Sequence, residues 1–130
     1  MVHPFRRAIE ARDLDAAVAL LRDDVVFRSP AVFTPYHGRD ALRRILEAVL
    51  AVFEDFRYVR EIGADIGVGA RDHALVFEAR VRDKQIEGCD FIQLDDDGAI
   101  SAFTVMVRPM SGMLALAEAM KAQLASADAK

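Results

Sequence analysis

The hydrophobic pattern of the chain changes its period at Phe56. Before this residue apolar side chains recur every three to four positions; after it they alternate with polar ones, as Phe77, Ala79 and Val81 do with charged neighbours. The first period is typical of amphipathic helices and the second of a strand with one buried face. The sequence therefore predicts an α+β domain, with helices packed on one face of an antiparallel sheet.

Three helices are predicted in the first part. The first covers residues 4–12, and the second covers residues 14–21 with Asp13 as its N-cap. A short strand over residues 25–28 separates them from a third helix, whose wide apolar face ends at Phe53.

The second part contains four predicted strands, at residues 58–66, 73–82, 85–94 and 99–109. Short connections between consecutive strands favour an antiparallel meander. Three aspartates and Gly98 form the last connection; they lack the ligand spacing of a calcium loop, so we predict a hairpin turn with a positive φ at Gly98. Ser111 is predicted to cap a final helix.

Length and composition restrict the class of protein. The 130 residues fit one domain, 1–130, and no uncharged run approaches the roughly 20 residues that cross a bilayer. A net charge of −4 without a basic patch argues against nucleic-acid binding. A single cysteine, Cys89, and no secretion signal at the N-terminus predict a cytoplasmic protein.

Three segments resemble a known family: residues 11–24, His-Gly-Arg-Asp-Ala-Leu at 37–42, and Asp-Phe-Ile-Gln-Leu at 90–94. They resemble the nuclear transport factor 2-like superfamily, and most closely its branch of SnoaL-like polyketide cyclases and ketosteroid isomerases. The resemblance implies a cystatin-like cone, an α+β half-barrel in which N-terminal helices close a curved antiparallel sheet. It also implies an apolar pocket that opens between helices and sheet, and a homodimer formed through the outer sheet face.

The catalytic residues of ketosteroid isomerases do not all carry over. Ser29 occupies the position of their general base, and Phe5 occupies that of their oxyanion-hole tyrosine. Their second oxyanion donor is a carboxylic acid kept neutral by an apolar site. That position falls on Asp90 when counted back from Gly98, whereas counting from the shared phenylalanine gives Cys89. We prefer the first count and expect a chemistry other than steroid isomerisation.

Asp90 is the leading catalytic candidate. Ile86, Gly88, Ile92 and Leu94 flank it at even spacing, so its strand face is otherwise apolar. Burial of a carboxyl group raises its pKa and suits it to proton transfer. Two structural alternatives stay open: Asp90 meets an arginine or a backbone N–H, or a bulge turns it to water.

Tyr36 and His37 are further catalytic candidates, because the loop that holds them borders the mouth of such a cone. A histidine can exchange protons near neutral pH, and a tyrosine can donate to an oxygen that gains charge. The alternative for His37 is that it only caps the third helix. The apolar side chains predicted to line the pocket or core are Phe5, Phe27, Phe33, Ile92, Phe103 and Met106.

The leading functional hypothesis is a pocket protein for a small apolar ligand, acting as a cofactor-independent isomerase, cyclase or lyase on an apolar carbonyl compound with Asp90 as acid and base. No metal-ligand spacing or phosphate loop is present, so neither metal nor cofactor is expected. The competing hypothesis is a non-catalytic ligand-binding or dimerisation module of the same fold. A third is an outer sheet face that recruits a macromolecule through alternating charges, which fit a symmetric dimer better: Glu78, Arg80, Arg82 and Glu87.

Overall fold

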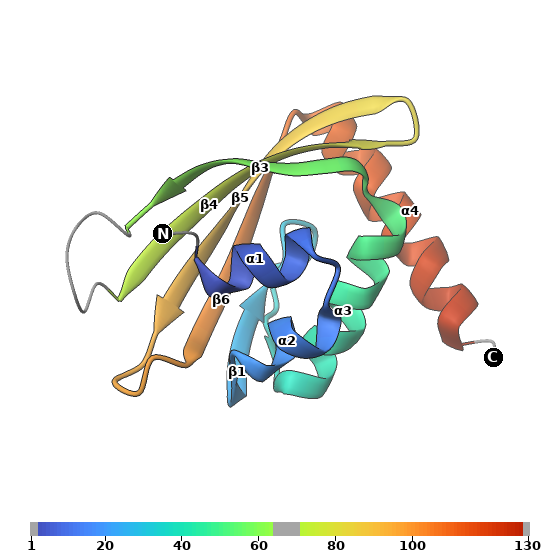
Figure 1. Cartoon of the computed structure of the whole chain (residues 1–130). Coiled ribbons are helices and arrows are strands. Elements are labelled where there is room, and N and C mark those ends of the chain that lie inside the picture. The colour runs from blue at the N-terminus through green and yellow to red at the C-terminus, as the bar shows by residue number, and fades with distance from the viewer. Residues whose placement is uncertain (1–2, 64–70, 129–130) are drawn as a thin grey trace.

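The computed structural model describes residues 3–63 and 71–128 (Figure 1). Its helices are α1 (Pro4–Glu10), α2 (Leu14–Ala19), α3 (Arg39–Val52) and α4 (Met110–Asp128). Its strands are β1 (Leu21–Arg28), β2 (Tyr36–His37), β3 (Glu54–Ile62), β4 (Asp72–Val81), β5 (Lys84–Leu94) and β6 (Ile100–Arg108). Figure 1 shows α1, α2 and α3 together on one face of the curved sheet, and α4 along its side. The predicted α+β half-barrel is confirmed.

The strands form one sheet in the order β2-β1-β6-β5-β4-β3. The last four strands in the sequence pair consecutively and antiparallel, as the short connections predicted. β1 adds to β6 in parallel, and β2 pairs with the free edge of β1. The N-terminal part of the chain therefore extends the sheet as well as covering it.

Alternation in β4 divides the sheet into two faces. Phe77, Ala79 and Val81 are almost completely buried beneath the helices, while Glu78 and Arg80 point to the opposite face. We call these the inner and outer faces. The predicted outer-face charges pair within the chain: Glu78 with Arg57, Arg80 with Glu54 and Asp55, Arg82 with Glu118, and Glu87 with Arg108.

Leu21 belongs to β1, and its prediction as a helical residue was wrong. The Leu21 carbonyl accepts hydrogen bonds from the Arg39 guanidinium, and the preceding carbonyl of Leu20 accepts from the Ile100 amide at 2.9 Å. These two carbonyls therefore bond to α3 and β6 and do not accept the backbone hydrogen bonds that would continue α2. The pairing of β1 with β6 then shifts register between Leu21 and Val26. Asp23 and Asp24 lie at this irregularity within the strand, whereas the sequence placed them before the strand begins.

Other element boundaries also differ from prediction. β3 begins at Glu54, four residues early, because Phe53 leaves the helix in an extended conformation. Residues 64–66, predicted in the same strand, lie outside the described residues. Tyr36 and His37 form a short strand instead of a loop. α4 starts at Met110, so Ser111 lies inside the helix and is not its cap.

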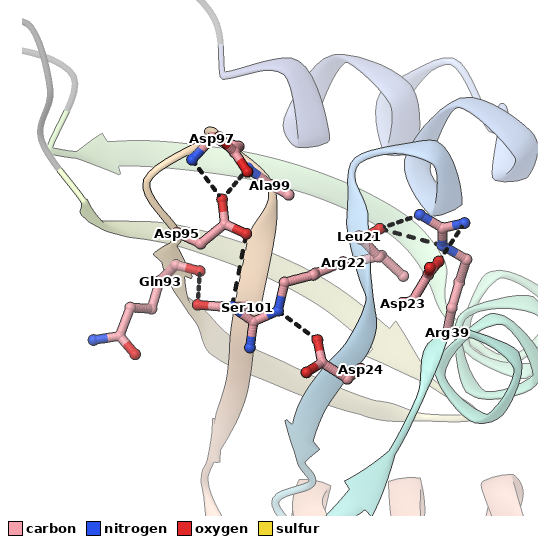
Figure 2. A network of polar contacts seen from close by, with 10 residues as sticks. All are labelled: Leu21, Arg22, Asp23, Asp24, Arg39, Gln93, Asp95, Asp97, Ala99 and Ser101. Atoms are coloured by element: carbon pink, nitrogen blue, oxygen red, sulfur yellow. Dashed lines mark hydrogen bonds and ion pairs between the residues drawn. The ribbon is translucent and has the colours of Figure 1, made fainter.

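The aspartate-rich connection between β5 and β6 is a structural turn (Figure 2). The Asp95 carboxylate accepts hydrogen bonds from the amides of Asp97 and Ala99, both at 2.9 Å, and lies 3.7 Å from Arg22. Gly98 has the predicted positive φ, 84°. Across residues 3–63 and 71–128, no group of three or more histidine, cysteine or carboxylate side chains is arranged to hold a metal ion.

Among the described helices, none is long and apolar enough to span a membrane.

Candidate functional site

A cavity of about 510 Å³ lies between the inner sheet face and the helices. Its wall is mostly apolar and combines residues from α1, α3 and the strands with one side of α4. The α4 contribution consists of Met113, Leu116, Ala117, Met120, Lys121 and Leu124. The volume lies in the range of pockets that enclose small organic ligands.

Asp90 reaches this cavity from the middle of β5. Even-numbered residues of β5 face inward, so Asp90 shares the inner face with Gly88 and Ile92, and it is only 6% exposed. The hydroxyl of Tyr58, on β3, donates a hydrogen bond of 2.9 Å to Asp90 Oδ2. Both side chains line the cavity. The site is therefore an acid–tyrosine pair on an apolar wall.

Burial determines the protonation of this pair. Desolvation raises the pKa of Asp90 to about 7, and the hydrogen bond from Tyr58 opposes that rise because it favours the carboxylate. The pKa of Tyr58 is raised well above its ordinary value, first by burial and then by the negative charge of Asp90. At neutral pH Tyr58 thus remains a donor, while Asp90 occurs in both acid and carboxylate forms.

Aromatic rings surround the pair. Phe56 contacts Tyr58 edge-on at 4.9 Å and Phe77 at 5.1 Å between ring centroids. Phe77 fits because its partner on β5 is Gly88, where an added Cβ would lie 2.2 Å from Phe77 Cζ. The glycine therefore leaves room for the Phe77 ring over β5, next to the inward-facing position of Asp90.

Four of the predicted residues besides Asp90 lie on the cavity wall: Phe5, Phe27, Tyr36 and Phe103. The rings of Phe5 and Phe103 meet at 5.0 Å, and Phe27 packs on Phe103 at 5.9 Å. Tyr36 contacts the same cluster through Phe27, at 6.2 Å, and remains 38% exposed. These residues form the part of the wall made by α1, β1, β2 and β6.

The other predicted residues lie elsewhere. Phe33 is fully exposed, His37 is exposed on β2, and neither lines the cavity. Ile92 is buried on the inner face but does not contribute to the wall, and Met106 is 60% exposed on the outer face. The interpretation of Phe33 and Met106 as pocket or core residues was wrong, because a loop has no period to orient Phe33 and Met106 alternates with the inward-facing Val105.

Ser29 also lines the cavity, at the end of β1. Its hydroxyl accepts hydrogen bonds from the amides of Val32 and Ala31, at 3.0 and 3.3 Å, so it stabilises the turn after the strand. Ser29 and Phe5, which the resemblance places at the positions of the isomerase base and tyrosine, therefore both face the cavity without supplying a second ionisable group.

Tyr58 is the residue of the candidate site that the sequence did not predict. Phe56 and Tyr58 are two residues apart and therefore lie on one face of the strand. Only the register of β3 against β4 shows which of them reaches Asp90. Phe77 is the direct partner of both Tyr58 and Gly88, so Tyr58 approaches Asp90 diagonally across β4. The sequence signal was weak, because the series Phe56, Tyr58, Arg60 and Ile62 includes an arginine and the register shifts after Tyr58.

The comparisons with known proteins agree with this architecture. Residues 2–103 match the family model of the SnoaL-like domain. No curated protein matches the chain.

Solved structures extend the match over almost the whole chain. A steroid delta-isomerase from Pseudomonas aeruginosa is 46% identical, with a TM-score of 0.88 over 95% of this chain and 88% of its own. A Silicibacter pomeroyi protein with a cystatin-like fold is 34% identical, with a TM-score of 0.83 over 92% of this chain and 82% of its own. A Mycobacterium tuberculosis protein in complex with estradiol-17beta-hemisuccinate is 16% identical and shares the fold, with a TM-score of 0.61 over 82% of this chain and 93% of its own. The chain belongs to the SnoaL-like domain family.

Proposed function

We propose that this protein is a cofactor-independent enzyme that moves a proton on an apolar carbonyl compound, as an isomerase, cyclase or lyase. The observation that carries the proposal is the buried Asp90 on the wall of an apolar cavity, with a pKa of about 7 and one hydrogen bond from Tyr58. A general base is most effective when its pKa lies near the working pH. The similarity to a steroid delta-isomerase supports the same class of reaction.

In the simplest form of this reaction, ionised Asp90 removes a proton from the carbon next to the carbonyl group. The electron pair of that C–H bond moves into an enolate, and Asp90 becomes a neutral acid. Asp90 then returns the proton to a different carbon of the conjugated enolate and the carbonyl group re-forms, so substrate and product are isomers. Tyr58 positions the carboxylate, and Tyr36 on the cavity wall is the proposed donor to the enolate oxygen.

Asp90→Asn tests the proposal. It keeps the shape of the side chain and its ability to accept from Tyr58, but it cannot take up a proton. We expect at least a hundredfold loss of turnover across a panel of polycyclic ketones, including β,γ-unsaturated ones whose conjugation is followed by absorbance. Asp97→Asn, on the exposed turn, is the matched control. Equal turnover in Asp90→Asn and the control would remove Asp90 from the mechanism.

The second candidate function is a ligand-binding module without catalysis. Phe5 and Ser29 favour it, because they leave the cavity with a single acid in place of a base and a separate oxyanion donor. Thermal shifts separate the two functions. A module gives ligand-dependent shifts that survive in Asp90→Asn and no turnover in either protein.

We also propose that the protein forms a homodimer through the outer sheet face. Intrachain pairing of the outer-face charges leaves Phe91 and Met106, 44% and 60% exposed, as the apolar groups that a partner would cover. Met106→Asp is expected to produce monomers in light scattering after gel filtration. A wild-type monomer at 100 μM would contradict this proposal.

A further inference from the structure

The negative and positive side chains of the cavity wall differ in their burial. Of the residues that line the cavity, the charged ones are Asp90, Arg12 and Lys121. Asp90 is buried, whereas Arg12 and Lys121 are exposed, so their cationic ends reach solvent at the rim. Within the described residues, a chain with a net charge of −4 thus has only positively charged side chains among those that line the rim of its cavity.

The acidic residues nearest to Arg12 in the sequence are occupied elsewhere. Asp13 caps α2, Glu10 pairs with Arg6, and Asp15 pairs with Arg43. The Arg12 guanidinium donates to the Leu50 carbonyl of α3 at 2.6 Å, which fixes the side chain without neutralising its charge. Arg12 also has a φ of 56°, a conformation that glycine or asparagine adopts more readily than a long side chain.

The charge of Lys121 is likewise not neutralised by a carboxylate in the described structure. Met120 and Leu124, beside it on α4, lie on the cavity wall. Glu118, one turn earlier, forms an ion pair of 3.4 Å with Arg82 instead. In the part of the chain that the structure describes, neither Lys121 nor Arg12 is paired with a carboxylate.

We propose that the cavity binds an amphipathic monocarboxylate, with its apolar body inside and its carboxylate at the rim against Arg12 and Lys121. The apolar wall cannot solvate a charge, and ionised Asp90 repels an anion, so only the rim accepts one. The ligand is thereby oriented with its anionic end outward and its far end toward Asp90. This inference rests on the proposed function, because it specifies the substrate class of the same site.

Two probes of equal chain length test the inference: decanoate and decan-1-ol, which differ chiefly in charge. We expect calorimetry at low ionic strength to show at least fivefold tighter binding of decanoate, and 0.5 M salt to reduce the difference. Lys121→Gln and Arg12→Gln should each weaken decanoate binding about threefold and leave decanol binding unchanged. Lys84→Gln, an exposed lysine that does not line the cavity, is the control.

Equal affinities for the two probes, binding of neither probe, or an equal loss of both in Lys121→Gln would overturn the inference. The ketone panel distinguishes this result from a failure of the proposed function. If no ketone is turned over, but the preference for decanoate persists and is reduced about threefold in Lys121→Gln, the catalytic proposal fails and the rim site stands. If Asp90-dependent turnover is found without any preference for decanoate, the rim site fails alone.

Discussion

Tyr58 and Asp90, on strands separated by β4, share a hydrogen bond of 2.9 Å on the wall of an apolar cavity. Burial favours the neutral acid and the tyrosine hydroxyl favours the carboxylate, so two opposed effects leave the pKa of Asp90 at about 7. The catalytic potential of the site depends on this balance.

Removal of the Tyr58 hydroxyl should raise the pKa of Asp90. In Tyr58→Phe the desolvation remains while the donor that stabilises the carboxylate is lost. Carboxyl ¹³C chemical shifts followed over pH 4 to 10 measure the midpoint directly. An unchanged or lower midpoint would show that Tyr58 does not donate to Asp90. Tyr36→Phe is the control, because no hydrogen bond joins Tyr36 to Asp90 in the described structure.

Asp90 should make the folded protein less stable as pH rises. Its pKa is raised on folding from 3.8 to about 7, so its contribution to stability is complete below pH 3.8 and is lost as pH rises through about 7. This rise in pKa corresponds to a change of about 4 kcal/mol in the free energy of unfolding. Urea unfolding should therefore show the free energy of unfolding of the wild type falling relative to Asp90→Asn between about pH 4 and 7, and then levelling. Parallel curves for the two proteins would contradict the raised pKa.

His3 should have the opposite effect. Its Nδ1 accepts the Phe5 amide at 3.1 Å as the cap of α1, and its ring meets His73 edge-on at 4.9 Å. The pKa of His3 is lowered, first by burial and then by His73, while Glu61 opposes the change. Stability from neutral His3 is therefore present above pH 6.5 and lost as pH falls below it.

His3→Asn keeps a capping oxygen but does not titrate. The wild type should lose stability relative to this variant between pH 6.5 and 5, as measured by thermal unfolding. Equal losses in both proteins would assign the pH dependence to other groups.

The sequence predicted those parts of the fold that depend on local periodicity. Phe77, Ala79 and Val81 alternate strictly, so the inner face of β4 was correctly assigned. The parallel pairing of β1 with β6 joins segments about 75 residues apart, as the pair Phe27 and Phe103 shows, and no local pattern records it.

In the candidate site, too, only the features that follow from local alternation were predicted. Strand alternation placed Asp90 on the inner face, where the structure has it. Its partner Tyr58 could not be predicted, because the register of β3 against β4 depends on a connection with no hairpin signature. Phe33 was placed on the wall because it is apolar, although a loop without periodicity does not fix which way a side chain points.

Gly88→Ala should disturb the site without touching its polar atoms. The added methyl group would lie 2.2 Å from Phe77 Cζ and must push that ring toward the cavity. We expect a loss of stability of about 1 to 3 kcal/mol together with weaker ligand binding. Cys89→Ala, on the neighbouring outward-facing residue, should cost less and leave binding unchanged. A Gly88→Ala protein as stable as the wild type would contradict the close packing of Phe77 on β5.

The central claim, that Asp90 exchanges protons with a carbonyl compound inside the cavity, is tested most directly by proton exchange. Polycyclic ketones are incubated with the enzyme in D₂O at neutral pH, and loss of the ¹H signal next to the carbonyl group is followed by NMR. We predict enzyme-dependent deuterium incorporation by the wild type and by Asp97→Asn, and a rate at least a hundredfold lower in Asp90→Asn. Incorporation at the same rate in Asp90→Asn, for any ketone that the wild type exchanges, would contradict the claim.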